Sequence, residues 1–134
     1  MNTTGLALVG LASWAIILSL FLVTVRVNAI RSGKALNSFD PAGKDLEGFS
    51  YRMTRVHANM LENLPILASF LLYALATGQS AVTAGLAVWL LYARLAQSVV
   101  HMISTSVPFV MMRATLFSAQ QFICLYWAWQ FWHA

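Results

Sequence analysis

The sequence contains very little charge. Only 12 of its 134 residues are charged, eight Lys or Arg and four Asp or Glu, whereas 60% are apolar. A soluble domain usually has about 25% charged and about 45–50% apolar residues. Nine of the charges lie within residues 26–55, and the rest of the chain carries only Glu62, Arg94 and Arg113. This distribution excludes an ordinary soluble domain, a disordered chain and a basic nucleic-acid-binding stripe, so we expect an integral membrane protein.

Cysteine and the usual catalytic motifs are also scarce. The single Cys124 cannot form an internal disulfide, so nothing indicates an oxidising compartment. His57, His101 and His133 neither share a helix face nor pair with a cysteine, so no metal site is expected. There is no glycine-rich phosphate loop. No Ser-His-Asp set can be assembled, because most of the acidic residues lie in one loop.

Long apolar runs predict four membrane-spanning helices, because about 20 apolar residues are needed to cross about 30 Å of hydrocarbon. Turn-forming residues at 77–80 and 104–108 divide these runs. The first run has no basic residue before it and is longer than the core of a signal peptide, so it is expected to be retained. We predict one all-α domain over 1–134, a four-helix membrane bundle with helices at about 3–25, 50–76, 81–103 and 109–132 and a loop at 26–49.

The basic residues lie in alternate connections. Six of the eight fall within 26–55, and Arg113 follows the 104–108 turn, whereas the N-terminus, the 77–80 turn and the C-terminus have none. By the positive-inside rule, both basic connections face the cytoplasm and both termini lie on the non-cytoplasmic side.

Polar residues form a stripe on the second predicted helix. At 100° per residue, Arg55, Asn59 and Glu62 fall within about 60° of one another. An ionised carboxylate in lipid is costly, so Glu62 is expected to face the protein interior or a wet cavity and to be paired. A functional role is favoured for Glu62. For Arg55, a side chain that reaches the membrane surface is an equally good interpretation.

The third predicted helix carries a matching polar face. Arg94, Ser98 and His101 are spaced i, i+4 and i+7, and Gln97 lies one turn from Arg94. Arg94 lies at a depth comparable with that of Glu62, so an ion pair between these two residues is predicted. Such a pair would lock two helices together, contact a ligand, or do both.

Arg113 begins the fourth predicted helix, where contact with lipid headgroups is the simplest role. A second possibility is a positively charged, cytoplasm-facing cluster that binds a small carboxylate-bearing ligand through guanidinium groups. Its members would be Arg55, Arg94, Arg113, Asn59, Gln97 and His101. An isolated intramembrane Glu also occurs in small proton-coupled exporters, but there it would not have three Arg residues nearby.

Residues 55–65, Arg-Val-His-Ala-Asn-Met-Leu-Glu-Asn-Leu-Pro, resemble the helix-2 signature Arg-x-His-x-Asn-x-x-Glu…Pro of the MAPEG superfamily. These are membrane-associated proteins of eicosanoid and glutathione metabolism. The resemblance is to bacterial-type, microsomal glutathione transferase-like members. It implies a homotrimer of four-helix subunits that binds glutathione at subunit interfaces near the cytoplasm. It also implies a multi-pass protein of the bacterial inner membrane, or of the endoplasmic reticulum in a eukaryote.

The resemblance also implies roles for particular residues. Arg113 would stabilise the glutathione thiolate, and the glutathione contacts would be Arg55, Asn59, Glu62, Arg94, Gln97, His101 and either Arg26 or Arg31. Ala114 and Phe117 stand where members with prostaglandin isomerase activity have Ser and Tyr, which argues against that chemistry. The implied function is a glutathione transferase or peroxidase for lipophilic electrophiles. Its partners are itself, glutathione, lipophilic small molecules and membrane lipids, not nucleic acid. A non-catalytic binding protein of the same fold is the main alternative.

Overall fold

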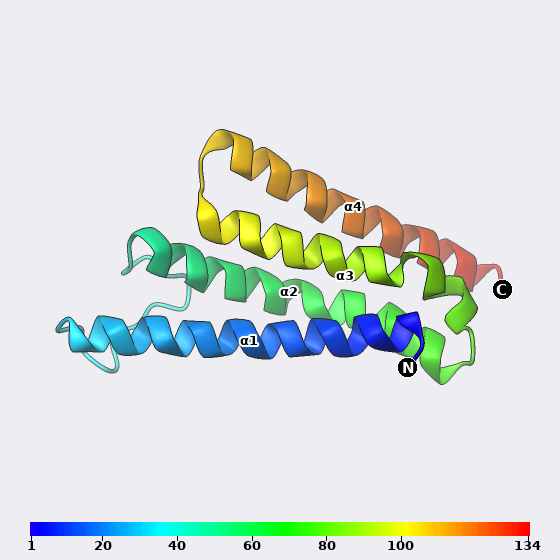
Figure 1. Cartoon of the computed structure of the whole chain (residues 1–134), viewed down its shortest axis with the longest axis horizontal. Coiled ribbons are helices and arrows are strands. Elements are labelled where there is room, and N and C mark those ends of the chain that lie inside the picture. The colour runs from blue at the N-terminus through cyan, green and yellow to red at the C-terminus, as the bar shows by residue number, and fades with distance from the viewer.

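The computed structural model describes all 134 residues as four α-helices without a strand. The helices are α1 (Thr3–Arg31), α2 (Gly48–Ala76), α3 (Ser80–Ile103) and α4 (Val107–Trp132). Successive helices run antiparallel (Figure 1). Both termini and the 77–79 turn lie at one end of the bundle, here the terminal end, and the 32–47 loop and the 104–106 turn lie at the other, the loop end. The predicted all-α, four-helix architecture is confirmed.

Helix α1 extends beyond residue 25, where its end was predicted. Arg26 and Arg31 lie on the helix instead of in the following loop. Residues 26–31 contain neither Gly nor Pro, and the chain leaves the helix just before Gly33, which adopts a φ of 106°. Glycine adopts such a φ without strain and commonly ends helices. The first charged residue, Arg26, therefore does not mark the end of this helix. An Arg can remain on a helix and extend its long side chain to the membrane surface.

The 32–47 loop is tied to the end of α1. Lys34 Nζ lies 2.6 Å from Asp45 Oδ2, which is the only ion pair in the protein. The hydrogen bond from Lys34 holds the pKa of the Asp45 carboxyl below its usual value. The Phe39 ring lies beneath two cations, with Arg26 at 5.4 Å and Lys34 at 5.2 Å from its centroid. The Lys34 contacts hold the loop together, and the Arg26–Phe39 contact holds it against the last turns of α1.

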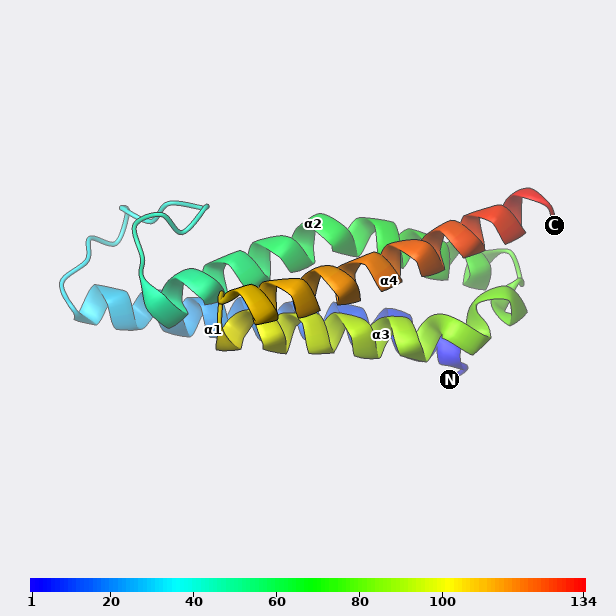
Figure 2. The same cartoon turned by 90° about the horizontal axis from the view of Figure 1, so that it is seen from above.

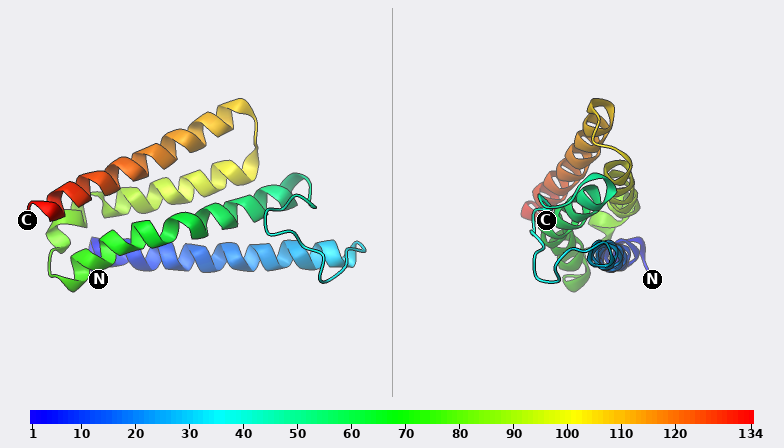
Figure 3. Two further views of the ribbon diagram at one scale, coloured as in Figure 1. Left: turned by 180° about the vertical axis from the view of Figure 1, so that it is seen from behind. Right: turned by 90° about the vertical axis from the view of Figure 1, so that its left-hand side faces the viewer.

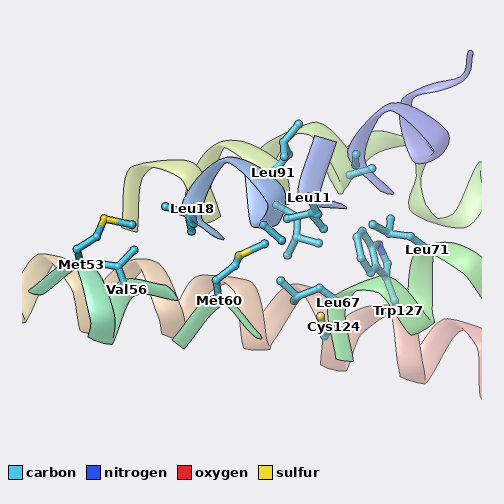
Figure 4. Close-up of a cluster of buried hydrophobic side chains, with 14 of the residues drawn as sticks. Leu11, Leu18, Met53, Val56, Met60, Leu67, Leu71, Leu91, Cys124 and Trp127 are labelled. Atoms are coloured by element: carbon cyan, nitrogen blue, oxygen red, sulfur yellow. The ribbon is translucent and has the colours of Figure 1, made fainter. Parts of the chain in front are cut away.

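The apolar core is built mainly from α1, α2 and α3, and Figure 4 shows most of it. Helix α4 adds only Cys124 and Trp127, the second of which is fully buried. The core of the first three helices includes Leu11, Leu18, Met53, Val56, Met60, Leu67, Leu71, Ala87, Leu90 and Leu91. Helices α1 to α3 therefore form the packed framework, and α4 is attached to it through α3.

Helix α4 leans away from the framework towards the loop end. In Figures 1 and 3 the start of α4, beside the 104–106 turn, stands farther from α1 and α2 than its C-terminal part does. In the view from above, α4 lies across α2 and α3 (Figure 2). Its packing is chiefly against α3, with few contacts to α2 and none to α1. The loop-end half of α4 is consequently the least enclosed part of the bundle.

Hydrogen bonds connect α1 to the other two framework helices at three levels along the bundle. At the terminal end, the Thr4 and Thr83 hydroxyls are 2.7 Å apart and join α1 to α3. In the middle, Trp14 Nε1 donates to Ser98 Oγ at 3.0 Å. Ser19 Oγ and His57 Nε2, 3.0 Å apart, join α1 to α2. His57 thus points away from Asn59 and the polar stripe of α2, as its position on the helix predicts.

Helices α1, α2 and α3 are each long and apolar enough to cross a membrane. Large apolar side chains are exposed on the outside of the bundle, including Trp89 at 65% and Phe122 at 69%. Helix α4 is of similar length and carries Arg113, Gln120, Gln121 and Gln130, and it is not among these three helices. Three of the four predicted crossings therefore meet the requirement for length and composition, and a crossing by α4 stays a prediction.

Candidate functional site

Four polar side chains from three helices form a closed ring of hydrogen bonds inside the bundle. Arg94 of α3 donates from Nε to Gln120 Oε1 of α4 and from Nη1 to Asn59 Oδ1 of α2, each at 2.8 Å. Gln120 Nε2 donates to Gln97 Oε1 at 2.8 Å, and Gln97 Nε2 donates to Asn59 Oδ1 at 3.1 Å. The ring, made of Asn59, Arg94, Gln97 and Gln120, is the main polar connection between α2, α3 and α4.

Arg94 is buried without a carboxylate partner. Its side chain is 1% exposed, and its Nη2 has no hydrogen-bond partner in the chain. The predicted ion pair between Glu62 and Arg94 is wrong, because Lys34–Asp45 is the only ion pair. Glu62 lies on the exposed face of α2, whereas the neutral amide of Asn59 faces Arg94. Amides thus replace the expected carboxylate, and Glu62 has no partner within its own chain.

A cavity of about 240 Å³ lies beside the ring. Its walls are Asn59, Gln97, Arg113, Ala114 and Phe117. It is formed by α2, α3 and the loop-end half of α4. The structure therefore brings Asn59, Gln97 and Arg113 together at one cavity, although they come from three helices. Two larger cavities contain no charged side chain in their walls, and one of them shares Ala114 with this cavity.

The remaining basic residues lie around this region at different depths. Arg55 and Arg113 are half-buried and His101 is buried at 9% exposure. The side chain of Arg52 donates from Nε to the Met102 carbonyl oxygen at 2.8 Å, which ties α2 to the end of α3.

Arg26 and Arg31 differ in their surroundings. Arg26 is half-buried beside Phe39, and its Nε is buried without a hydrogen-bond partner, whereas Arg31 is exposed. Neither residue contributes to the walls of the 240 Å³ cavity. Of the two alternatives for an additional ligand contact, Arg26 is therefore the one with a constrained position and an unused donor.

Gln120 was not predicted from the sequence. It is fully buried and makes three hydrogen bonds, including one from Nε2 to the Leu116 carbonyl oxygen at 3.0 Å. The sequence does contain a pattern that indicates its position: Gln120 follows Arg113 by seven residues, so it lies on the same face of the helix two turns further along. A polar residue inside an apolar membrane helix needs partners in the protein interior, and this requirement marks Gln120 in the same way as it marks Gln97.

The fold, the hydrogen-bonded ring and the cavity beside it together indicate a class of membrane protein. The molecule is a bundle of membrane-spanning length with a cationic and amide-rich site between its helices at the loop end. The chain belongs to the MAPEG family, since residues 4–132 match the family model. This match, over nearly the whole chain, confirms the resemblance to the MAPEG superfamily. A search of curated proteins and a search of solved structures each returned no match.

Proposed function

We propose that the protein is a membrane glutathione transferase that acts on lipophilic electrophiles. Family membership supports a membrane protein of glutathione-related transferase or peroxidase type. The main support for glutathione as the ligand is the cavity lined by Asn59, Gln97 and Arg113. A cationic side chain beside two amides suits a peptide with two carboxylates and a thiol. The electrophile would enter from the surrounding hydrocarbon.

Arg113 is the proposed catalytic residue. Its guanidinium would favour the anionic form of the bound thiol and so lower the thiol pKa. The thiol proton would pass to solvent. The thiolate sulfur would then form a bond to an electrophilic carbon, and a leaving group such as chloride would depart with the electron pair of its bond. Ala114 and Phe117 line the same cavity and offer no hydroxyl, so the charge of Arg113 would act on the sulfur without help from a neighbouring side chain.

The other proposed contacts are distributed around the cavity. Arg55 would bind a carboxylate with Arg26 or Arg31, and Arg94, Gln97 and His101 would line or support the site. Glu62 would accept from the amine or an amide of glutathione. Ligand sites usually have volumes of about 300–1,000 Å³, so a cavity of about 240 Å³ in one protomer is small for a tripeptide. The exposed, unpaired Glu62 and this small volume both support a site that a second subunit completes in a homotrimer.

The absence of a hydroxyl from the walls of the cavity also favours a second candidate, a binding protein without turnover. The test that separates the two uses protein purified in detergent and titrated with glutathione, followed by ultraviolet absorbance of the thiolate and by conjugation of chlorodinitrobenzene. Wild type is expected to bind, to show thiolate absorbance and to form the conjugate. Binding without thiolate or conjugate would identify the binding protein, and the absence of binding would overturn both.

Variants assign the roles. Arg113→Ala is expected to bind glutathione within a few fold of wild type but to lose thiolate absorbance and about a hundredfold in kcat. Glu62→Gln is expected to weaken glutathione binding, and Lys44→Ala, in the exposed loop, serves as the control. Normal turnover in Arg113→Ala would show that another residue stabilises the thiolate.

A further inference from the structure

The amide of Asn59 is held in one of its two possible orientations. An Arg guanidinium can only donate hydrogen bonds, so the Asn59 atom that lies 2.8 Å from Arg94 Nη1 must be the oxygen. The same rule applies at the other end of the guanidinium. The Gln120 atom that lies 2.8 Å from Arg94 Nε must also be an oxygen. One arginine thus fixes two amides on two different helices.

The remaining bonds of the ring agree with this assignment. Because the Gln120 oxygen faces Arg94, its nitrogen faces the Leu116 carbonyl oxygen and Gln97 Oε1. Since the Gln97 oxygen accepts from Gln120, the Gln97 nitrogen must face Asn59. A donor at this place needs an acceptor, so the Asn59 atom facing Gln97 must be the oxygen. Reversing any one amide would break at least one bond of the ring, because two donors or two acceptors would face each other. Gln120 is the member that connects the Leu116 backbone, Arg94 and Gln97.

The fixed orientation of the Asn59 amide determines which of its atoms can contact a molecule in the cavity. Asn59 Oδ1 accepts two hydrogen bonds inside the ring, from Arg94 and from Gln97. Asn59 Nδ2 has no hydrogen-bond partner in the chain, and it is accessible rather than buried. Asn59 is also a wall of the 240 Å³ cavity. Its amide therefore offers N–H donors, and not an acceptor, to a bound molecule. The cationic Arg94 behind the oxygen strengthens these donors by polarising the amide.

We propose that Gln120, which lies outside the cavity wall, is a positioning residue: it holds Arg94 and Gln97 where both donate to Asn59 Oδ1, so that Asn59 presents its N–H donors to the cavity and the site selects an acceptor oxygen at this point. The polarity follows from the ring alone. The identity of the acceptor, a carboxylate or peptide carbonyl oxygen of glutathione, rests on the proposed function.

The first test uses the full-length protein in detergent without any ligand. The side-chain N–H signals of Asn59 and of Arg94 Nε are recorded by heteronuclear NMR in wild type, Gln120→Met and Gln130→Met. Gln130 lies on the same helix, where it bonds only to Tyr126, so it is the matched control. Gln120→Met is expected to shift both signals, and Gln130→Met neither. Unchanged Asn59 and Arg94 signals in a folded Gln120→Met protein would overturn the positioning role.

The second test measures selection by the amide. In Asn59→Asp, one carboxylate oxygen can still accept from Arg94 and Gln97, but the other presents an acceptor to the cavity. This variant is expected to fold, since Arg94 gains a counter-ion, and to lose at least about a hundredfold in glutathione affinity. Gln120→Met is expected to raise the glutathione KM about tenfold while kcat at saturation changes little. Undiminished affinity in Asn59→Asp would overturn the predicted polarity.

The two tests also separate this inference from the proposed function. If wild type does not bind glutathione, the proposed function fails, and the ligand-free NMR comparison still decides whether Gln120 orients Asn59. If Gln120→Met does not fold, Asn59→Asp decides the polarity through binding and through its own effect on the Arg94 Nε signal.

Discussion

Arg94 is the residue on which the polar interior depends. It is a buried cation in an apolar bundle, and two amides rather than a carboxylate accept its hydrogen bonds. An unpaired buried charge is expensive, so each of these hydrogen bonds matters more than one at a surface. The geometry uses the planar fork of the guanidinium, because Nε and Nη1 reach different helices.

We therefore expect Arg94→Lys to be poorly tolerated although it keeps the charge. A lysine ammonium is a single point and cannot hold Gln120 Oε1 and Asn59 Oδ1 in the arrangement that the fork allows. The loss of one charge-assisted hydrogen bond should lower the free energy of unfolding by about 1.5–3 kcal/mol. Thermal unfolding in detergent measures this change.

Arg52→Lys is the matched control for this prediction. Arg52 makes one hydrogen bond, to the Met102 carbonyl oxygen, and a lysine can make the same bond. Little change is expected in this variant. Equal melting temperatures for wild type and Arg94→Lys would contradict the importance of the fork.

Spacing along single helices was enough to predict that Asn59, Arg94 and Gln97 share one polar region. The partner of Arg94 could not be predicted in this way. Helical periodicity gives the angle between Asn59 and Glu62 but not the rotation of α2 against α3, and a small rotation decides which of the two faces Arg94. Gln120 could not be paired with Arg94 either, because the tilt of α4 follows from its packing on α3.

At the level of elements, the bundle consists of a framework of α1 to α3 and a more loosely attached α4. Long apolar runs and clear turns made the framework helices predictable, and only the end of α1 differed by more than two residues, because Gly33 rather than Arg26 decides that boundary. The hydrogen bond from Trp14 Nε1 to Ser98 Oγ belongs to this framework. Ser98 was predicted on the same polar face as Arg94, yet its hydroxyl contacts α1 instead of the ring.

Ser98→Ala should separate the framework from the site. The Trp14 indole loses its acceptor, and interhelical hydrogen bonds in membranes contribute about 0.6–1.7 kcal/mol each. We expect a lower unfolding temperature and an unchanged glutathione affinity. Ser13→Ala, at an exposed position of α1, is the control. A large loss of glutathione affinity in Ser98→Ala would mean that Ser98 supports the site directly.

For the whole molecule, the arrangement of charge agrees with one orientation in a membrane. The 32–47 loop and the 104–106 turn, with their neighbouring basic residues, lie at the loop end, and both termini lie at the opposite end (Figure 1). The site and the basic residues therefore share one side of the bundle. This arrangement depends on α4 crossing the membrane, and α4 is the helix whose composition supports a crossing least.

Cysteine labelling tests this topology in intact bacterial cells that express the protein. Cys124 is buried, and Cys124→Ala gives a background without a native thiol. In that background, Ala35→Cys is placed in the loop and Ala134→Cys at the C-terminus, both at exposed positions. If α4 crosses the membrane and the positive-inside rule holds, a membrane-impermeant maleimide should label Ala134→Cys but not Ala35→Cys. Labelling of Ala35→Cys alone would reverse the orientation. Protection of both until the cells are permeabilised would show that α4 does not cross, because the C-terminus would then lie on the same side as the loop.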